Sequence, residues 1–471
     1  MKSFKSFRST KIVSTLGPAS HDIKVIKSLM ISGVNVFRLN FSHGSHEDHL
    51  KSIKHIRNLE KKLNLQIAIL ADLQGPKFRI GEMEDGILIK AGARFKFDKL
   101  KSLGNIQRVY LSHEEIYSGV RVNSIIMLDD GKLKFRVLKK NKNEIYTKVI
   151  IGGKLTSNKG LNLPDIILDT SPITLKDKRD LKFILKNEID WIALSFVQKL
   201  SDVLKVKKII KNQVSLISKI EKPSAINELD EIIKVSDGIM VARGDLGVEL
   251  PPERVPGIQK EIILACRIAG KPVIVATQML ESMINNPSPT RAEASDVATA
   301  VFDGADAVML SAETAIGKFP IETVKIMDKI LNAAEVHIKT HPTDAPISLT
   351  AESTIYHAVS RSAVNLAETV DAKAIVAFTA SGKTALRISR ERPELMLVVM
   401  TPKHLVRRRL SLLWGTISFL SKVQGYEAAI QEARRIIKKN KLAAQGENIV
   451  VVAGMPFGIS GSTNSIRVVT I

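Results

Sequence analysis

Two stretches of sequence decide the fold: Ser215-Leu216-Ile217-Ser218-Lys219-Ile220 and Gly238-Ile239-Met240-Val241-Ala242. Each is a short, largely apolar run that is followed by polar residues and then by a helix-like pattern. Such runs are typical of parallel strands buried on both faces and alternating with helices. Further runs of this kind lie at residues 11–15, 34–39, 67–72, 190–195, 272–277 and 307–310. Eight such units close into a (βα)8 TIM barrel, which is the predicted α/β fold.

The pattern changes between the third and fourth runs. Glycines recur there at short intervals, and alternating runs such as Lys132-Leu133-Lys134-Phe135-Arg136-Val137 appear. Both features are typical of antiparallel strands. We predict an inserted all-β lid domain at residues 75–164, because an insertion after the third strand lies at the barrel mouth. An inserted domain without catalytic motion is the alternative.

A separate α/β domain is predicted after a linker that contains Pro342 and Pro346. A helix is expected at residues 350–369 and strands at 373–378, 395–400 and 449–453. The predicted limits are 1–74 for the first part of the barrel, 75–164 for the lid, 165–340 for the second part of the barrel and 341–471 for the C-terminal domain.

Length and composition exclude several classes of protein. The 471 residues suffice for two to four domains, and 44% of them are apolar. No apolar run reaches the 18 or more residues of a spanning helix, so no membrane partner is expected. The single cysteine, Cys266, fits a cytoplasmic protein, and the basic residues 1–11 lack the apolar core of a leader, which predicts a mature N-terminus.

The net charge is strongly positive, at 70 − 48 = +22. The lysines are scattered and aromatic residues are only 5%, so we expect no nucleic-acid partner. A lysine-rich solvated surface is the favoured interpretation, and an anionic small-molecule substrate is the second.

Polar side chains follow most of the predicted strands. The carboxyl ends of barrel strands meet at one mouth, where side chains from separate strands contact a substrate. The residues expected there are Arg38, Asn40, Ser42, Asp72, Ser195, Lys219, Glu221, Asp245, Thr277, Ser311 and Glu313.

Lys219 and Glu221 lie two residues apart at a strand end and therefore project to the same side. With Asp245, which follows the next strand, they offer two carboxylates beside an ammonium, a set suited to Mg²⁺ and a polyanion. A surface ion pair and a helix cap are the alternative interpretations. Arg38 offers a planar fork for a phosphoryl group, and the Thr277 hydroxyl could relay a proton.

These segments resemble the pyruvate kinase family, in order, from Thr10 to the C-terminus. The same is true of Thr15-Leu16-Gly17-Pro18-Ala19-Ser20, Pro289-Thr290-Arg291-Ala292-Glu293 and Met309-Leu310-Ser311-Ala312-Glu313-Thr314-Ala315. The resemblance implies transfer of the phosphoryl group of phosphoenolpyruvate to ADP, which gives pyruvate and ATP in the last step of glycolysis. It also implies a homotetramer under allosteric control.

By this resemblance Glu221 and Asp245 hold Mg²⁺ or Mn²⁺, and the catalytic residues are Lys219, Arg38, Thr277 and Ser311. The implied substrate-binding residues are Arg38, Ser195, Lys219, Ala242, Arg243, Gly244, Asp245 and Thr277. Those near the nucleotide are Thr15, Pro18, Asn40, His43 and Arg79. For His43, a turn histidine satisfied by the backbone is an equal alternative.

Many family members need K⁺, held by groups that match Asn40, Ser42, Asp72 and the carbonyl of Leu73, and carry Glu where this chain has Lys77. The resemblance is to the K⁺-independent branch. A fixed ammonium at Lys77 would replace the mobile cation. Should Lys77 point to solvent instead, K⁺ would still be required.

A C-terminal segment resembles the family's effector loop, which takes sugar phosphates in some members. Hydroxyls, a glycine and a lysine before a predicted helix form a phosphate cradle, so a sugar phosphate or nucleotide effector is expected. An ordinary capped helix is the alternative. The candidate residues are Thr379, Ser381, Gly382, Lys383 and Thr384.

Two other functions compete with this interpretation. One is another Mg²⁺-dependent barrel that handles enolates, such as an aldolase or lyase, which needs the two carboxylates but not Lys219 beside Arg38. The other is a non-catalytic anion-binding protein on the same scaffold, which the loss of Lys219, Glu221 or Asp245 would have favoured. All three residues are present.

Overall fold

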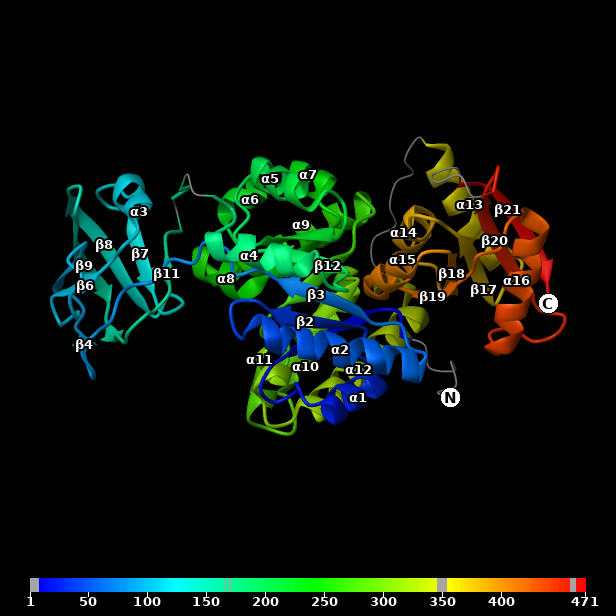
Figure 1. Cartoon of the computed structure of the whole chain (residues 1–471), viewed down its shortest axis with the longest axis horizontal. Coiled ribbons are helices and arrows are strands. Elements are labelled where there is room, and N and C mark those ends of the chain that lie inside the picture. The colour runs from blue at the N-terminus through cyan, green and yellow to red at the C-terminus, as the bar shows by residue number, and fades with distance from the viewer. Residues whose placement is uncertain (1–7, 165, 169–170, 345–353, 458–462) are drawn as a thin grey trace.

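A central barrel carries one domain at each end of the molecule (Figure 1). The computed structural model describes residues 8–164, 166–168, 171–344, 354–457 and 463–471. The sheet domain that follows β3 lies at one end of the long axis, and the C-terminal α/β domain lies at the other.

The barrel is closed by eight parallel strands in the order β1-β16-β15-β14-β13-β12-β3-β2. This confirms the predicted TIM barrel, because all eight predicted runs form its strands. The strands are β1 (Lys11–Leu16), β2 (Val36–Asn40), β3 (Ala68–Asp72), β12 (Trp191–Leu194), β13 (Ser215–Ile220), β14 (Gly238–Ala242), β15 (Val273–Ala276) and β16 (Ala307–Leu310).

Helices between these strands form the outer ring, and local sequence signals begin several of them. Ser45, Thr174 and Thr290 each accept a hydrogen bond from an amide in the first turn and complete a capping box. The helices are α1 (Ile23–Ser32), α2 (His46–Leu63), α4 (Leu175–Ile184), α5 (Leu200–Ile210), α6 (Pro223–Asn227), α7 (Leu229–Val235), α8 (Arg243–Glu249), α9 (Val255–Ile268), α10 (Arg291–Asp303), α11 (Ala312–Ala315) and α12 (Pro320–Thr340).

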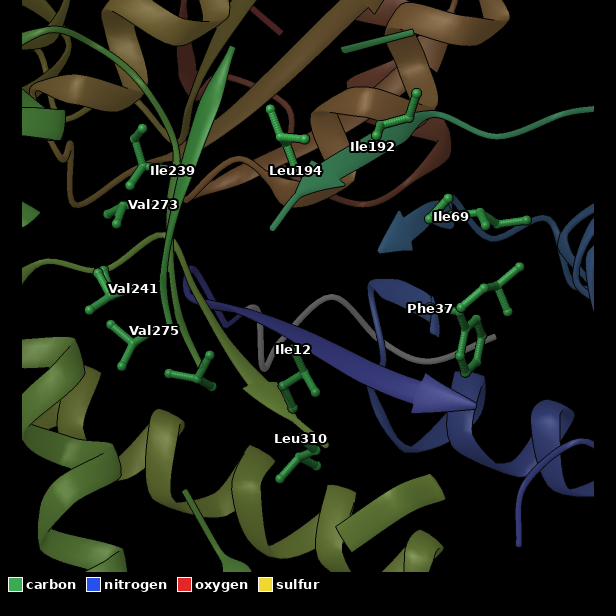
Figure 2. Packing of buried hydrophobic residues seen from close by; sticks show 14 of the residues in the cluster. Ile12, Phe37, Ile69, Ile192, Leu194, Ile239, Val241, Val273, Val275 and Leu310 are labelled. Carbon is green, nitrogen blue, oxygen red and sulfur yellow. The ribbon is translucent and has the colours of Figure 1, made fainter. Parts of the chain in front are cut away.

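The core of the barrel has two layers, because alternate residues of each strand point to opposite sides. Figure 2 shows the outer layer, where Ile12, Ile69 and Val241 belong to the cluster between strands and helices. A second cluster includes the alternate residues Val13 and Leu70, and one residue of the C-terminal domain, Leu412, joins it. The C-terminal domain therefore shares a hydrophobic core with the barrel.

The inserted domain is built on a six-stranded sheet of order β11-β7-β8-β9-β5-β6 and a separate pair, β10-β4. The expectation of an all-β insertion is wrong in one detail, because α3 (Glu114–Gly119) is helical and buries Ile116 and Tyr117 against the sheet. The strands are β4 (Leu88–Ile89), β5 (Arg94–Asp98), β6 (Arg108–Tyr110), β7 (Ile125–Leu128), β8 (Leu133–Lys140), β9 (Glu144–Ile151), β10 (Gly153–Lys154) and β11 (Leu161–Asn162).

The C-terminal domain has a five-stranded sheet of order β19-β18-β17-β20-β21. The three predicted strands are confirmed as β17 (Ala374–Phe378), β18 (Met396–Thr401) and β20 (Asn448–Gly454). β19 (Thr416–Leu420) and the antiparallel edge strand β21 (Thr463–Thr470) were not predicted, since both are only partly apolar. The helices are α13 (Ile355–Thr369), α14 (Lys383–Arg390), α15 (His404–Arg409) and α16 (Tyr426–Lys439), and residues 350–353 of the predicted first helix lie outside the described residues.

Among the helices of the described residues, none combines the length and the apolar character that a membrane crossing requires.

Candidate functional site

A buried ammonium lies at the centre of the barrel mouth. Nζ of Lys219, at the end of β13, donates a hydrogen bond to Oγ of Ser195 at 2.8 Å. It also lies 2.8 Å from Oε1 of Glu221 and 3.3 Å from Oδ1 of Asp72. Three strands, β3, β12 and β13, thus bring their ends together around one amine, as predicted from the sequence.

Arg38, at the end of β2, is held beside this amine by the same carboxylate. Its Nε and Nη2 each lie 2.7 Å from Oδ2 of Asp72, and its Nη1 donates to Oγ1 of Thr15 at 3.1 Å. Thr15, expected near the nucleotide, is buried under Arg38 and donates its own hydroxyl to the carbonyl of Leu310. Because Asp72 bridges Arg38 and Lys219, the two cations are fixed in orientation before any substrate arrives.

The pKa values of the charged groups at the barrel mouth follow from their close packing. Burial alone would lower the pKa of Lys219, but the carboxylates of Asp72 and Glu221 outweigh it and keep the pKa above its ordinary value. Burial also acts against ionisation of Asp72, yet Lys219 and Arg38 hold its pKa below the usual range. The Lys219 amine is therefore protonated at neutral pH.

Glu221 has the features expected of a cation ligand. Its Oε2 accepts a hydrogen bond from the amide of Phe196 at 2.6 Å, and its buried Oε1 has the ammonium of Lys219 as its partner at 2.8 Å. Burial, reinforced by repulsion from Asp245, raises the pKa of Glu221 to about 6. A divalent cation held by the carboxylates of Glu221 and Asp245 would offset the cost of burying Glu221 and the repulsion between the two groups.

Asp245, near the start of α8, lines the cavity at the mouth and is only partly buried. The described residues contain no group of three or more His, Cys, Asp or Glu side chains arranged to hold a metal. Two carboxylates and substrate oxygens form a set that Mg²⁺ accepts, so the residues present fit that ion.

Thr277 has an unusual backbone at the end of β15. Its φ is +70°, which is rare for a β-branched residue and is found where surrounding contacts over-determine the chain. Its Oγ1 accepts the amide of Gly244 at 2.8 Å and donates to the carbonyl of Ala276 at 2.6 Å. The Gly244 amide, expected to bind a substrate carboxylate, is therefore used by Thr277 in this structure.

Two neighbours of Thr277 lie differently from what their predicted roles suggest. The Arg243 side chain pairs with Asp296 of α10 at 2.6 Å and donates from Nη2 to the carbonyl of Thr277 at 2.7 Å, so its guanidinium holds the backbone of Thr277. Ser311 does not contact Thr277, and its buried Oγ has no hydrogen-bond partner among the described residues.

The residues expected near the nucleotide and a monovalent cation lie around this centre. Pro18, His43 and Arg79 are exposed, and Arg79 donates to the carbonyl of Asn158 in the lid at 2.9 Å. Oδ1 of Asn40 accepts the amide of Ser42 at 3.1 Å, and the carbonyl of Leu73 accepts Oγ of Ser195 at 2.7 Å.

Lys77 lies at the hinge between barrel and lid. It is half-buried and lines a cavity of about 710 Å³ together with Asp130 of the lid and Asp245 of the barrel. Its ammonium forms no ion pair or hydrogen bond with any residue that the structure describes. It therefore does not point wholly to solvent, although it does not contact Asp72.

A buried cluster that joins lid and barrel was not predicted from the sequence. Oε1 of Glu249, at the end of α8, accepts Nδ2 of Asn162 in β11 at 2.8 Å and lies 2.5 Å from Nζ of Lys222. The Glu249 side chain is 1% exposed. One carboxylate thus connects the last strand of the lid to the helix of Asp245 and to the residue after Glu221.

The candidate effector loop precedes α14. Ser381 and Lys383 are exposed, whereas Thr379 and Thr384 are buried. Oγ1 of Thr379 accepts a hydrogen bond from the Gly382 amide at 2.9 Å. The hydroxyl of Thr384 shares a hydrogen bond with that of Thr463 at 2.7 Å. In the described structure the two threonine hydroxyls therefore serve the loop itself.

Comparisons with known proteins agree with this geometry. A family model described as the barrel domain of pyruvate kinase matches residues 7–324, and one described as the alpha/beta domain of pyruvate kinase matches residues 357–469. A curated relative from Agrobacterium vitis named pyruvate kinase is 49% identical and covers 98% of this chain and 98% of its own length. Another, from Methylorubrum extorquens, is 43% identical with the same coverage of both chains. A crystal structure of a pyruvate kinase from Cryptosporidium parvum superposes with a TM-score of 0.90 at 36% identity, covering 98% of this chain and 96% of that one.

Proposed function

The chain belongs to the pyruvate kinase family, and from this premise we propose how its barrel mouth performs the reaction. The protein is a phosphotransferase that moves the phosphoryl group of phosphoenolpyruvate to ADP, giving pyruvate and ATP. The observation that supports the proposed residue roles most directly is the contact of Lys219 with Ser195, Asp72 and Glu221.

We propose that Arg38 and Lys219 orient the phosphoryl group and balance its charge. An oxygen of the terminal ADP phosphate attacks phosphorus, and the bond from phosphorus to the enol oxygen breaks. Such a transfer depends on positioning and on fixed charge more than on covalent help from the protein. Asp72 keeps both cations in place, so little reorganisation accompanies the reaction.

Members of the family generally use Mg²⁺, and we propose that Glu221 and Asp245 hold it here, with Mn²⁺ as a substitute. The ion supplies positive charge to the carboxylate and phosphoryl oxygens of the substrate. The burial of the Glu221 carboxylate, which already faces the Lys219 cation, and its repulsion from Asp245 support this assignment.

The enolate left by the transfer takes up a proton at carbon, and we propose that the Thr277 hydroxyl lies on the proton path. Its strained backbone and its contact with the Gly244 amide place it at the mouth beside the helix of Asp245. Its hydroxyl hydrogen, which is now directed at the Ala276 carbonyl, has to turn to serve that path. We propose that Ser311, whose buried Oγ has no hydrogen-bond partner among the described residues, serves the same step.

The activity is tested by supplying phosphoenolpyruvate, ADP and Mg²⁺ and measuring pyruvate and ATP separately. Equal amounts of the two products are expected. An aldolase or lyase on this scaffold would form no ATP, and a non-catalytic anion-binding protein would form neither product.

We propose that the enzyme does not require K⁺. Both oxygens of Asp72 already face cations, and Lys77 adds a positive charge at the hinge. In buffer free of K⁺ and NH₄⁺ the rate is expected to stay within about twofold of the rate with K⁺. A tenfold or greater loss, equal to roughly 1.4 kcal/mol of barrier, contradicts the proposal. Lys77→Glu is expected to make the rate depend on added K⁺.

The Glu249 cluster is proposed to position the lid. Glu249→Gln removes the negative charge that Lys222 faces while keeping an acceptor for the Asn162 amide. Breaking a buried ion pair of this kind lowers the free energy of unfolding by about 3–5 kcal/mol. We expect a lower Tm and a KM for ADP that rises at least fivefold, with a smaller change in KM for phosphoenolpyruvate, because the nucleotide lies nearer the lid. Glu253→Gln, on the exposed segment after α8, is the matched control. Equal changes in both KM values would contradict the positioning role.

We propose that the domains meet at residues 74/75, 164/165 and 340/341. We also propose that the protein is a cytoplasmic homotetramer and that its effector is a sugar phosphate or a nucleotide. For the effector loop, the exposed Ser381 and Lys383 before α14 support an anionic ligand.

A further inference from the structure

A partly open cavity of about 240 Å³ lies between the barrel and the C-terminal domain. We call it the interdomain cavity. From the barrel side it is lined by Arg267 near the end of α9, Val301 of α10 and Ile338 of α12. From the other side it is lined by Arg390, Arg392 and Trp414. It contains none of the residues assigned above to the active site or to the effector loop.

Arg267 is a buried charge without a partner. It is 5% exposed, its Nε is buried without an acceptor, and its guanidinium makes no hydrogen bond or ion pair with any described residue. A guanidinium does not lose its proton in a protein, and a buried unpaired charge is costly. Burial, with repulsion from Arg392, lowers the pKa of Arg267 to about 10, in keeping with its lack of a partner.

The anionic groups around the cavity are largely engaged with other partners. The Glu335 carboxylate accepts the amides of Ser9 and Thr10 at 2.8 and 2.7 Å. Oδ1 of Asp306, the acid nearest to Arg392, lies 3.0 Å from Nη1 of that residue. Hence neither acid makes an ion pair with Arg267.

The Glu391 carboxylate, which also lines the cavity, attracts Arg267 and offsets part of the positive charge without pairing with it. Oε1 of Glu391 lies 3.7 Å from Nε2 of His357, whose Nδ1 is 3.0 Å from Nη1 of Arg390. Glu394 and Lys339 are exposed at the rim and carry opposite charges. Three guanidinium groups thus face one small space, and among them Arg267 is the one without an acceptor in the described part of the chain; Oε1 of Glu391 is likewise buried there without a hydrogen-bond donor.

We propose that the interdomain cavity is a binding site for a compact oxyanion, a phosphate or carboxylate compound, with Arg267 as its anchor. Arg267 offers a planar fork that suits either group. The apolar lining, which includes Val301, Ile338 and Trp414, accepts a small apolar portion. A volume of about 240 Å³ is below that of sites for drug-sized ligands, so the ligand is a small metabolite and not a nucleotide.

The position of the cavity indicates what an occupant would influence. Arg392 holds Asp306, which directly precedes β16, and β16 ends at Leu310, one residue before Ser311 at the barrel mouth. Arg392 also stacks on Trp414, with 4.8 Å between the guanidinium carbon and the ring centroid. An anion beside Arg267 therefore lies against the contact that joins the C-terminal domain to a barrel strand.

Trp414 makes occupancy measurable without any assay of turnover. The chain has two tryptophans, so Trp191→Phe leaves Trp414 as the single indole reporter. We would titrate this variant with sodium phosphate and with sodium isovalerate, a branched carboxylate, and keep ionic strength constant with sodium chloride. A saturable change in Trp414 emission at millimolar concentration is expected for at least one of the two, with a rise in Tm. A response to phosphate alone assigns phosphate compounds, and a response to isovalerate alone assigns carboxylates.

Arg267→Met in the same background is expected to weaken the saturable response at least tenfold. Arg435→Gln, an exposed arginine on α16, is the matched control and should leave it unchanged. Ile338→Trp, combined with a fluorine-labelled ligand and read by ¹⁹F NMR, fills the cavity from its apolar side and should also abolish binding. No saturable response to either anion, or one that survives both Arg267→Met and Ile338→Trp, would overturn the proposal. Neither result depends on whether the protein makes ATP.

Discussion

Lys219→Met is expected to lower kcat by about a thousandfold or more, equal to roughly 4 kcal/mol of barrier, while divalent-cation binding persists. The amine lies within 3.3 Å of groups on three strand ends and is the only lysine there among the described residues. Methionine matches the lysine side chain as far as Cε but removes Nζ and with it the charge that the transferring phosphoryl group requires.

The control for this variant is Lys24→Met, an exposed lysine on α1, which should be indistinguishable from wild type. Binding of Mn²⁺ and circular dichroism should show that Lys219→Met is folded and still holds the ion. A kcat within tenfold of wild type would remove Lys219 from its assigned role.

Glu221→Gln is expected to weaken Mn²⁺ binding by at least a hundredfold and to lower kcat/KM by a similar factor or more. The amide keeps the shape of the side chain and an acceptor for the Phe196 amide, but removes the charge that faces Asp245. Electron paramagnetic resonance of free Mn²⁺ measures the binding directly.

Glu231→Gln, exposed on α7, is the matched control for this second substitution. Asp245→Asn should resemble Glu221→Gln, because both carboxylates are proposed to hold one ion. Unchanged Mn²⁺ affinity in both variants would contradict the shared site.

The barrel and its mouth could be predicted because both depend on short-range patterns. Strands such as β13 and β14 are largely apolar, and a polar residue at the carboxyl end of such a strand lies at or near the mouth. The convergence of Lys219, Asp72 and Arg38 follows from that rule alone. The roles of these residues came from the family resemblance.

Other features depend on contacts that no local pattern reports. The Glu249 cluster joins residues that are 87 positions apart, and nothing around Asn162 indicates a partner on α8. Similarly, Arg267 follows a helical pattern and looks like a surface residue until the C-terminal domain covers it. Helix α3 is too short for its periodicity to stand out between strands.

Anomalous diffraction from crystals grown with Mn²⁺ and phosphoenolpyruvate tests the central claim most directly. We predict one strong Mn²⁺ peak in the barrel mouth, bonded to carboxylate oxygens of both Glu221 and Asp245, with Nζ of Lys219 facing the phosphoryl group. A peak that touches neither carboxylate, or a substrate phosphoryl group remote from Lys219, would contradict the account.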